Sequence, residues 1–176
     1  MENNNNNIIF NRVWNMPNKN TFDIKPIKEL IGKYFKEEYM SVDPFANKSK
    51  ICKITNDLDP DMDTTHHLDA LDFLKTFEDN SVDFVLYDPP FSSRQLSECY
   101  KKLGMSVNME TTQSSFFFFL KKEIGRITKE NAIVISFGWN TNGIGKTQGF
   151  QIIEILTVAH GGNHNDTICT VEIKKG

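Results

Sequence analysis

The sequence predicts a single α/β domain whose mostly parallel sheet ends in an antiparallel hairpin. Apolar runs typical of buried strands alternate along the chain with stretches that have helical spacing. One such run, Val82 to Tyr87, stops at Asp88-Pro89-Pro90, where two prolines prevent both further strand pairing and the start of a helix. Near the end of the chain, Gly149 to Ala159 and Asp166 to Lys174 flank a Gly-Gly pair, which favours a hairpin.

Length and composition limit what the chain can be. Its 176 residues suffice for one domain with a hydrophobic core, and we expect a flexible segment over 1–20 before a folded domain over 21–176. The net charge of −3 is not that of a dedicated nucleic-acid clamp, so contact with nucleic acid must come from local patches or a partner. We see no membrane-spanning run and no signal peptide, and therefore expect a cytoplasmic protein without membrane contact. The three scattered cysteines are typical of buried, reduced thiols: Cys52, Cys99 and Cys169.

The first part of the chain is the least regular. The asparagine tract Met1 to Asn7 has nothing to bury, so we expect disorder there. The following segment, Ile8 to Asn20, has no clear pattern and is expected to be irregular. Apolar residues at helical spacing then predict a helix over 27–36, with Pro26 at its first position.

The next two strands are expected unusually close together, at about 39–43 and 51–57. Only residues 47–50 separate the loop that follows the first strand from the second strand. A parallel crossover normally needs about a dozen residues or more, usually including a helix. The sequence therefore predicts that the usual crossover helix is missing or that these strands are joined in another way.

The remaining elements follow the same alternation. A short apolar stripe predicts a helix over 68–74 before the central strand at 82–87. A helix is expected over 111–127, despite its run of phenylalanines, and a buried strand over 132–137. The carboxyl ends of the parallel strands then share one edge of the sheet, where ligands bind in open α/β sheets.

Two tetrads carry a family resemblance. Asp88-Pro89-Pro90-Phe91, together with Asp43-Pro44-Phe45-Ala46 earlier in the chain, resembles the motifs of S-adenosylmethionine-dependent methyltransferases that act on exocyclic amino groups of bases. The chain is most similar to small phage-type DNA adenine-N6 methyltransferases. The resemblance covers roughly Thr21 to Lys174 and implies a Rossmann-like class I sheet with S-adenosyl-L-methionine as cofactor.

The resemblance also implies a catalytic site at Asp88, Pro89, Pro90 and Phe91. An amino nitrogen on a base is a weak nucleophile because its lone pair is delocalised into the ring. Hydrogen-bond acceptors at its two N–H groups favour a pyramidal nitrogen that can attack the methyl group. By resemblance, the Asp88 carboxylate and the Pro89 carbonyl are these acceptors, and Phe91 stacks on the extruded adenine.

Cofactor contacts are implied at four places along the chain. Asn47 stands where the family has glycine, and Asn tolerates the left-handed conformation that such a turn requires. We expect weak cofactor binding from this departure. An acid after the second strand should meet the ribose hydroxyls, and Asp59 competes with Asp57 for that role. The residues implied are Thr21, Phe22, Ile24, Asp43, Pro44, Phe45, Ala46, Asp57, Asp69 and Ala70.

Other interpretations stay open from the sequence. An RNA methyltransferase of the rRNA guanine-N2 type has a similar Asp-Pro-Pro-Phe motif, and a non-catalytic methyltransferase-fold subunit would fit the altered cofactor loop. No separate target-recognition domain is apparent, so DNA specificity would come from short loops or a second subunit. We expect no metal, because His66 and His67 have no third ligand in register.

Overall fold

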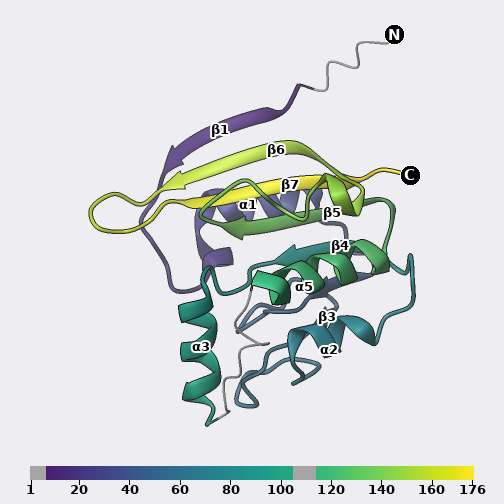
Figure 1. Ribbon diagram of the computed structural model, residues 1–176. Helices are drawn as coiled ribbons and strands as arrows, with labels where there is room; N and C mark the ends of the chain where they lie inside the picture. Colours follow the sequence, from purple (N-terminus) through teal and green to yellow (C-terminus); the bar gives the residue numbers. More distant parts are fainter. Residues whose placement is uncertain (1–6, 105–113) are drawn as a thin grey trace.

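The computed structural model describes residues 7–104 and 114–176. Among these residues, seven strands form one sheet in the order β1-β6-β7-β5-β4-β2-β3 (Figure 1). The pairs β1/β6, β2/β3, β2/β4 and β4/β5 are parallel, whereas β5/β7 and β6/β7 are antiparallel. The sheet is therefore mostly parallel and closes with an antiparallel hairpin, as predicted. The strands are β1 (Ile9–Trp14), β2 (Ser41–Asp43), β3 (Ile54–Thr55), β4 (Val82–Tyr87), β5 (Thr128–Gly138), β6 (Phe150–Ala159) and β7 (Thr167–Lys174).

Each of the three helices that the sequence predicts lies close to its predicted position. The described helices are α1 (Lys25–Tyr34), α2 (Ala70–Lys75), α3 (Ser93–Lys102) and α5 (Ser114–Ile127), with short 3-10 helices η1 (Thr21–Asp23) and η2 (Lys146–Gln148). The helix predicted over 27–36 begins two residues earlier, which puts Pro26 at its second position. The part of the predicted 111–127 helix that covers 111–113 lies outside the described residues, as does the asparagine tract over 1–6. No helix in the described part of the chain is long and apolar enough to span a bilayer.

Helices cover both faces of the sheet, with α1 behind it and α5 in front in Figure 1. Ile27 of α1 packs in one core with Phe84 of β4. Leu120 of α5 packs in a second core with Val85, the next residue of β4. Because consecutive strand residues point to opposite faces, β4 is buried on both sides. It lies between β2 and β5, which confirms the predicted central position.

The crossover from β2 to β3 contains no helix, as the sequence predicts. The two strands are parallel neighbours, yet residues 44–53 between them form only turns and bends. The Lys53 N–H donates to Ser41 Oγ at 2.9 Å, which ties the end of this connection to the start of β2. Such a short return is possible because β2 has three residues and β3 has two, so the chain has little length to retrace.

Strand β1 shows that the irregular course expected for Ile8 to Asn20 is wrong over Ile9–Trp14. This segment pairs in parallel with β6 and forms one edge of the sheet. Five of its six residues are exposed, so it lacks the one-sided apolar alternation by which a strand is recognised in a sequence. Backbone pairing with a distant part of the chain holds it in place instead.

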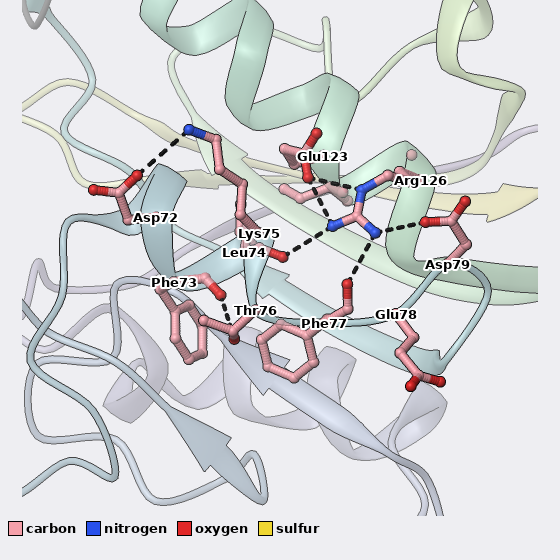
Figure 2. Close-up of polar contacts among 12 residues, drawn as sticks. Asp72, Phe73, Leu74, Lys75, Thr76, Phe77, Glu78, Asp79, Glu123 and Arg126 are labelled. Atoms are coloured by element: carbon pink, nitrogen blue, oxygen red, sulfur yellow. Dashed lines mark hydrogen bonds and ion pairs between the residues drawn. The ribbon is translucent and has the colours of Figure 1, made fainter.

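An arginine joins α5 to the segment that leads into β4 (Figure 2). Arg126 donates to the backbone carbonyls of Phe77 and Leu74 at 2.9 and 3.3 Å. Its guanidinium also pairs with Asp79 at 2.6 Å and with Glu123 at 2.8 Å. A planar group with five donors is suited to join several acceptors in this way. Arg126 therefore fixes the position of α5 against the loop before the central strand.

Candidate active site

The direction in which the sheet grows reverses at β2. From β2 the chain passes to β3 on one side, and then to β4 on the other. In open α/β sheets, ligands bind outside the carboxyl ends of the strands at such a reversal. A cavity of about 290 Å³ lies there, lined by residues that follow β2, β3 and β4 and by residues of α3.

The Asp88-Pro89-Pro90-Phe91 tetrad forms part of the cavity wall. The Phe91 N–H donates to Gln95 Oε1 at 2.7 Å. Gln95 lies in the first turn of α3, where its own N–H donates to the Ser92 side chain, the N-cap of that helix. Two proline rings and this helix start together hold the tetrad in one conformation. Gln95 was not predicted from the sequence, although it comes only four residues after Phe91.

Asp88 is half-buried directly after β4. Burial raises the pKa of its carboxyl group to about 6, and a hydrogen bond with the Thr21 side chain acts in the opposite direction. Thr21 thus contacts the tetrad in addition to lining the cavity. Above about pH 6 the Asp88 carboxylate is ionised and is a strong acceptor for an N–H group.

Two further carboxyl groups, those of Asp43 and Asp57, lie near Asp88. Asp43 is fully buried at the end of β2. Burial raises its pKa well above the ordinary value, the Phe45 N–H that donates to Oδ1 lowers it, and the charges of Asp88 and Asp57 raise it further. No lysine or arginine is present among the described residues that line the cavity. The charge distribution therefore favours a cationic ligand.

The loop after β2 has the conformation that the sequence predicts for Asn47. This residue has a φ of 49°, in the left-handed region where glycine is usual and Asn is tolerated. Its N–H donates to Asp57 Oδ2 at 2.9 Å, and Asp57 Oδ1 accepts from the Asp59 N–H at 2.9 Å. Asp57 lines the cavity, whereas Asp59 does not. Of the two competing acids, Asp57 is the one at the site.

Asn56 is a cavity residue that the sequence did not predict. Its side chain donates to the carbonyls of Pro44 and Leu68 at 3.2 and 3.0 Å, and accepts from the Leu68 N–H at 2.9 Å. Only 1% of Asn56 is exposed. It therefore joins the loop after β2 to the segment before α2, and both line the same cavity.

Asp69 joins two helices beside the cavity. One carboxylate oxygen accepts from the Leu71 N–H at 2.9 Å as the N-cap of α2, and the other accepts from the Tyr100 hydroxyl. Asp69 does not line the cavity, whereas its neighbour Ala70 does. Its carboxylate holds α3 against α2, and the predicted contact with the cofactor adenine stays a prediction.

The other predicted cofactor residues divide into two groups. Half of the ten line the cavity: Thr21, Pro44, Phe45, Asp57 and Ala70. The other five do not line it: Phe22, Ile24, Asp43, Ala46 and Asp69. The second group supports the loops that the first group belongs to.

Aromatic rings stand beside the tetrad. Phe91 meets Trp139, the residue after β5, with ring centroids 5.4 Å apart. Both line a second opening of about 240 Å³, together with His160 and Thr167 of the hairpin region. Trp139 is 43% exposed, so a flat substrate could reach the pair from solvent. Thr21 and Phe91 line both openings, which places a cofactor-sized cavity and an aromatic opening on either side of the same motif.

The cysteines differ from expectation at one position. Cys52 and Cys169 are buried, as predicted, but Cys99 is exposed. It lies on α3, lines the first cavity, and belongs to neither hydrophobic core. Within residues 7–104 and 114–176, no group of three His, Cys, Asp or Glu side chains could hold a metal ion.

Comparison with solved structures identifies the fold. TrmN from Thermus thermophilus superposes with a TM-score of 0.53 and 16% identity, over 86% of this chain and 49% of that one. A SAM-dependent methyltransferase from Methanosarcina mazei superposes with a TM-score of 0.50 and 11% identity, over 83% of this chain and 97% of that one. The chain has a Rossmann-like methyltransferase fold. It spans about half the length of TrmN. No protein-family model and no curated protein sequence matches it.

Proposed function

We propose that this protein transfers a methyl group from S-adenosylmethionine to the exocyclic N6 of adenine in DNA. One observation carries the proposal. A half-buried carboxylate, a proline carbonyl and an aromatic ring follow one another at the end of the central strand, between a cavity that favours a cation and an opening lined by aromatic rings.

The first cavity suits the proposed cofactor in size and charge. S-adenosylmethionine supplies an activated methyl group on a positively charged sulfur. Asp57 and Asp88 line a cavity without described basic residues, so they would stabilise that charge. Asp57 is placed by the Asn47 and Asp59 N–H groups and would meet the ribose hydroxyls. Phe45 and Ala70 supply apolar contact for the adenine ring.

The tetrad would position the amino group that receives the methyl. The Asp88 carboxylate accepts a hydrogen bond from one N–H of the target amino group and the Pro89 carbonyl accepts from the other. These bonds strengthen as the nitrogen gains positive charge, so they stabilise the transition state more than the bound substrate. Phe91 stacks on the extruded base, and Trp139 beside it narrows the opening.

We assign this activity to residues 21–176, which contain every residue named above. The target sequence would be read by loops around the aromatic opening or by a second subunit. The formal net charge of −3 makes a long basic DNA groove on this chain alone an unfavourable alternative.

A substrate panel tests the proposal. The protein is incubated with methyl-labelled S-adenosylmethionine and with matched DNA and RNA strands that contain adenine, cytosine or guanine as the sole amino-bearing base. Label in adenine of DNA is the expected result. Label in guanine of RNA would support the rRNA guanine-N2 type of enzyme instead. Absence of label from every strand, with an intact fold, would support a non-catalytic subunit.

A further inference from the structure

Three hydroxyl groups form a row across the face of the sheet that α5 covers. Tyr87 of β4 is in register with Ser136 of β5, and Ser136 is in register with Thr170 of β7. The three residues are 3%, 7% and 1% exposed. None of their hydroxyl oxygens has a hydrogen-bond partner among the residues that the structure describes. Buried polar groups are nearly always paired, so three unpaired neighbours require an explanation.

The row reaches a third cavity, which adjoins the methyl-transfer site. Tyr87 and Ser136 line a cavity of about 180 Å³, which is bounded by Pro89 to Phe91 on one side and by the loop after β5 on the other. Asp88 does not line this cavity, whereas it does line the first one. The two cavities therefore adjoin different parts of the tetrad.

The described residues that line this cavity include one basic side chain and no acidic one, and the remaining polar side chains are the two hydroxyls and the amides of Asn140 and Asn142. Lys121 of α5 lines it and is half-buried. The carboxylate of Glu172, which is fully buried nearby, already accepts from the N–H groups of Ile144 and Gly145 at 2.6 and 2.9 Å. Burial lowers the pKa of Lys121 and the charge of Glu172 raises it. One ammonium and two unpaired hydroxyls without a free carboxylate match an anion with several acceptor oxygens.

We infer that this cavity is a phosphate-binding subsite, in which Lys121 supplies the charge and the Tyr87 and Ser136 hydroxyls donate hydrogen bonds. A phosphate has the acceptor oxygens to pair all three groups at once. The cavity shares Pro89, Pro90 and Phe91 with the motif that would hold the target base, so a phosphate of the same strand is the nearest source. That source rests on the proposed function, whereas the phosphate site itself does not.

Fluorescence of Trp139 measures binding directly, because Trp139 lines the cavity. Trp14→Phe removes the other tryptophan of the chain, which is exposed on β1. Inorganic phosphate and a single-stranded adenine-containing oligonucleotide are titrated separately, without S-adenosylmethionine. The test variants are Lys121→Met, Tyr87→Phe and Ser136→Ala. Lys122→Met is the matched control, because Lys122 is the next residue of α5 and is exposed.

The hydroxyl variants should keep the fold, since the group that each loses has no described partner. Their melting temperatures without phosphate should equal or exceed that of the parent protein. We expect Lys121→Met to weaken phosphate binding about tenfold or more, and each hydroxyl variant by about threefold to tenfold. Lys122→Met should change it by less than about twofold. Unchanged affinity in all three test variants, or no binding of phosphate or oligonucleotide by the folded parent protein, would overturn the inference.

The source of the phosphate is identified with oligonucleotides that carry one neutral methylphosphonate linkage beside the adenine. Loss of affinity at one such linkage, abolished by Lys121→Met, assigns the site to a strand phosphate. Equal affinity at every linkage, with inorganic phosphate still bound through Lys121, assigns it to a free phosphate. These titrations contain no S-adenosylmethionine and do not measure methyl transfer. Their outcome therefore tests the phosphate site even if the protein proves to have no methyltransferase activity.

Discussion

Phe91 and Trp139 meet edge to face, with their ring planes inclined at 68°. The Phe91 backbone is held by Gln95, whereas Trp139 begins the loop after β5. The two rings therefore belong to loops that follow different strands, β4 and β5. Such a pair leaves one ring face available for stacking while the other ring limits how far a base can move.

Phe91 should contribute mainly to substrate binding. Phe91→Ala should weaken binding of adenine-containing DNA by about 1–3 kcal/mol, the usual contribution of base stacking. Phe91→Trp should be tolerated because it keeps the aromatic face. Fluorescence anisotropy with a labelled oligonucleotide gives both affinities. Equal loss in the Ala and Trp variants would show that packing against Trp139, rather than stacking on a base, is what matters.

The rate of methyl transfer should depend on pH through Asp88. Its folded pKa of about 6 means that the carboxylate becomes available as pH rises through that value, so the rate should rise from pH 5 to pH 7. Asp88→Asn keeps an acceptor oxygen but cannot titrate, so its lower rate should be flat across this range. An unchanged pH profile in Asp88→Asn would assign the titration to another group.

The raised pKa of Asp88 should also make the stability of the protein depend on pH. The pKa of Asp88 is raised on folding from its ordinary value of 3.8 to about 6, so the unfolded chain loses its proton first as pH rises. The free energy of unfolding should therefore fall between these two pH values. Asp88→Asn should lack this contribution and be more stable than the parent protein above pH 6. Denaturant titrations at pH 4 and pH 7 measure the difference.

Much of this site could be predicted because its signals are local in the sequence. The strand that ends at Asp88, the hairpin, the absent crossover helix and the left-handed Asn47 all follow from neighbouring residues. Asp69 also had a local signal, since an acid before Ala70 and Leu71 is a good N-cap. The structure shows that Asp69 is the N-cap of α2.

What could not be predicted depends on contacts between distant residues. Tyr100 reaches Asp69 from 31 positions away, and Asn56 bridges two loops. The pairing of β1 with β6 has no pattern in its own residues, because the strand is exposed and held by backbone bonds. The hydroxyl row across Tyr87, Ser136 and Thr170 exists only once the register of three strands is known.

Cys99 offers a direct measure of cofactor binding. It is the exposed cysteine of the three and lines the first cavity, while Cys52 and Cys169 are buried. Burial and the charge of Asp57 raise the pKa of the Cys99 thiol, so alkylation should be slow at neutral pH and faster at pH 9. S-adenosylmethionine should slow it by about tenfold or more at saturation. Mass spectrometry of the labelled peptide locates the modification, and equal rates with and without cofactor would place the cofactor elsewhere.

Arg126 should matter for stability and not for chemistry. It donates to two carbonyls and pairs with two carboxylates (Figure 2), and it lines none of the three cavities beside the tetrad. Arg126→Ala should lower the free energy of unfolding by about 2 kcal/mol, since hydrogen bonds to charged groups contribute about 1.5–3 kcal/mol. Arg126→Lys should recover only part, because an ammonium lacks the planar fork. Lys122 is exposed on α5 and serves as the control. Lys122→Ala should change the free energy of unfolding by less than about 0.5 kcal/mol.

The most direct test of the proposed chemistry compares Asp88→Ala with the parent protein in a single-turnover assay of methyl transfer. Both are mixed with labelled S-adenosylmethionine and adenine-containing DNA at pH 7.5, and N6-methyladenine is measured by mass spectrometry. The parent protein should form it, and Asp88→Ala should be slower by about two orders of magnitude or more. At saturating S-adenosylmethionine, Asp88→Ala should still protect Cys99 from alkylation, because Asp57 and the other residues that line the cavity remain. Near-normal formation of N6-methyladenine by Asp88→Ala would contradict the assignment of the Asp88 carboxylate as the hydrogen-bond acceptor for the target amino group.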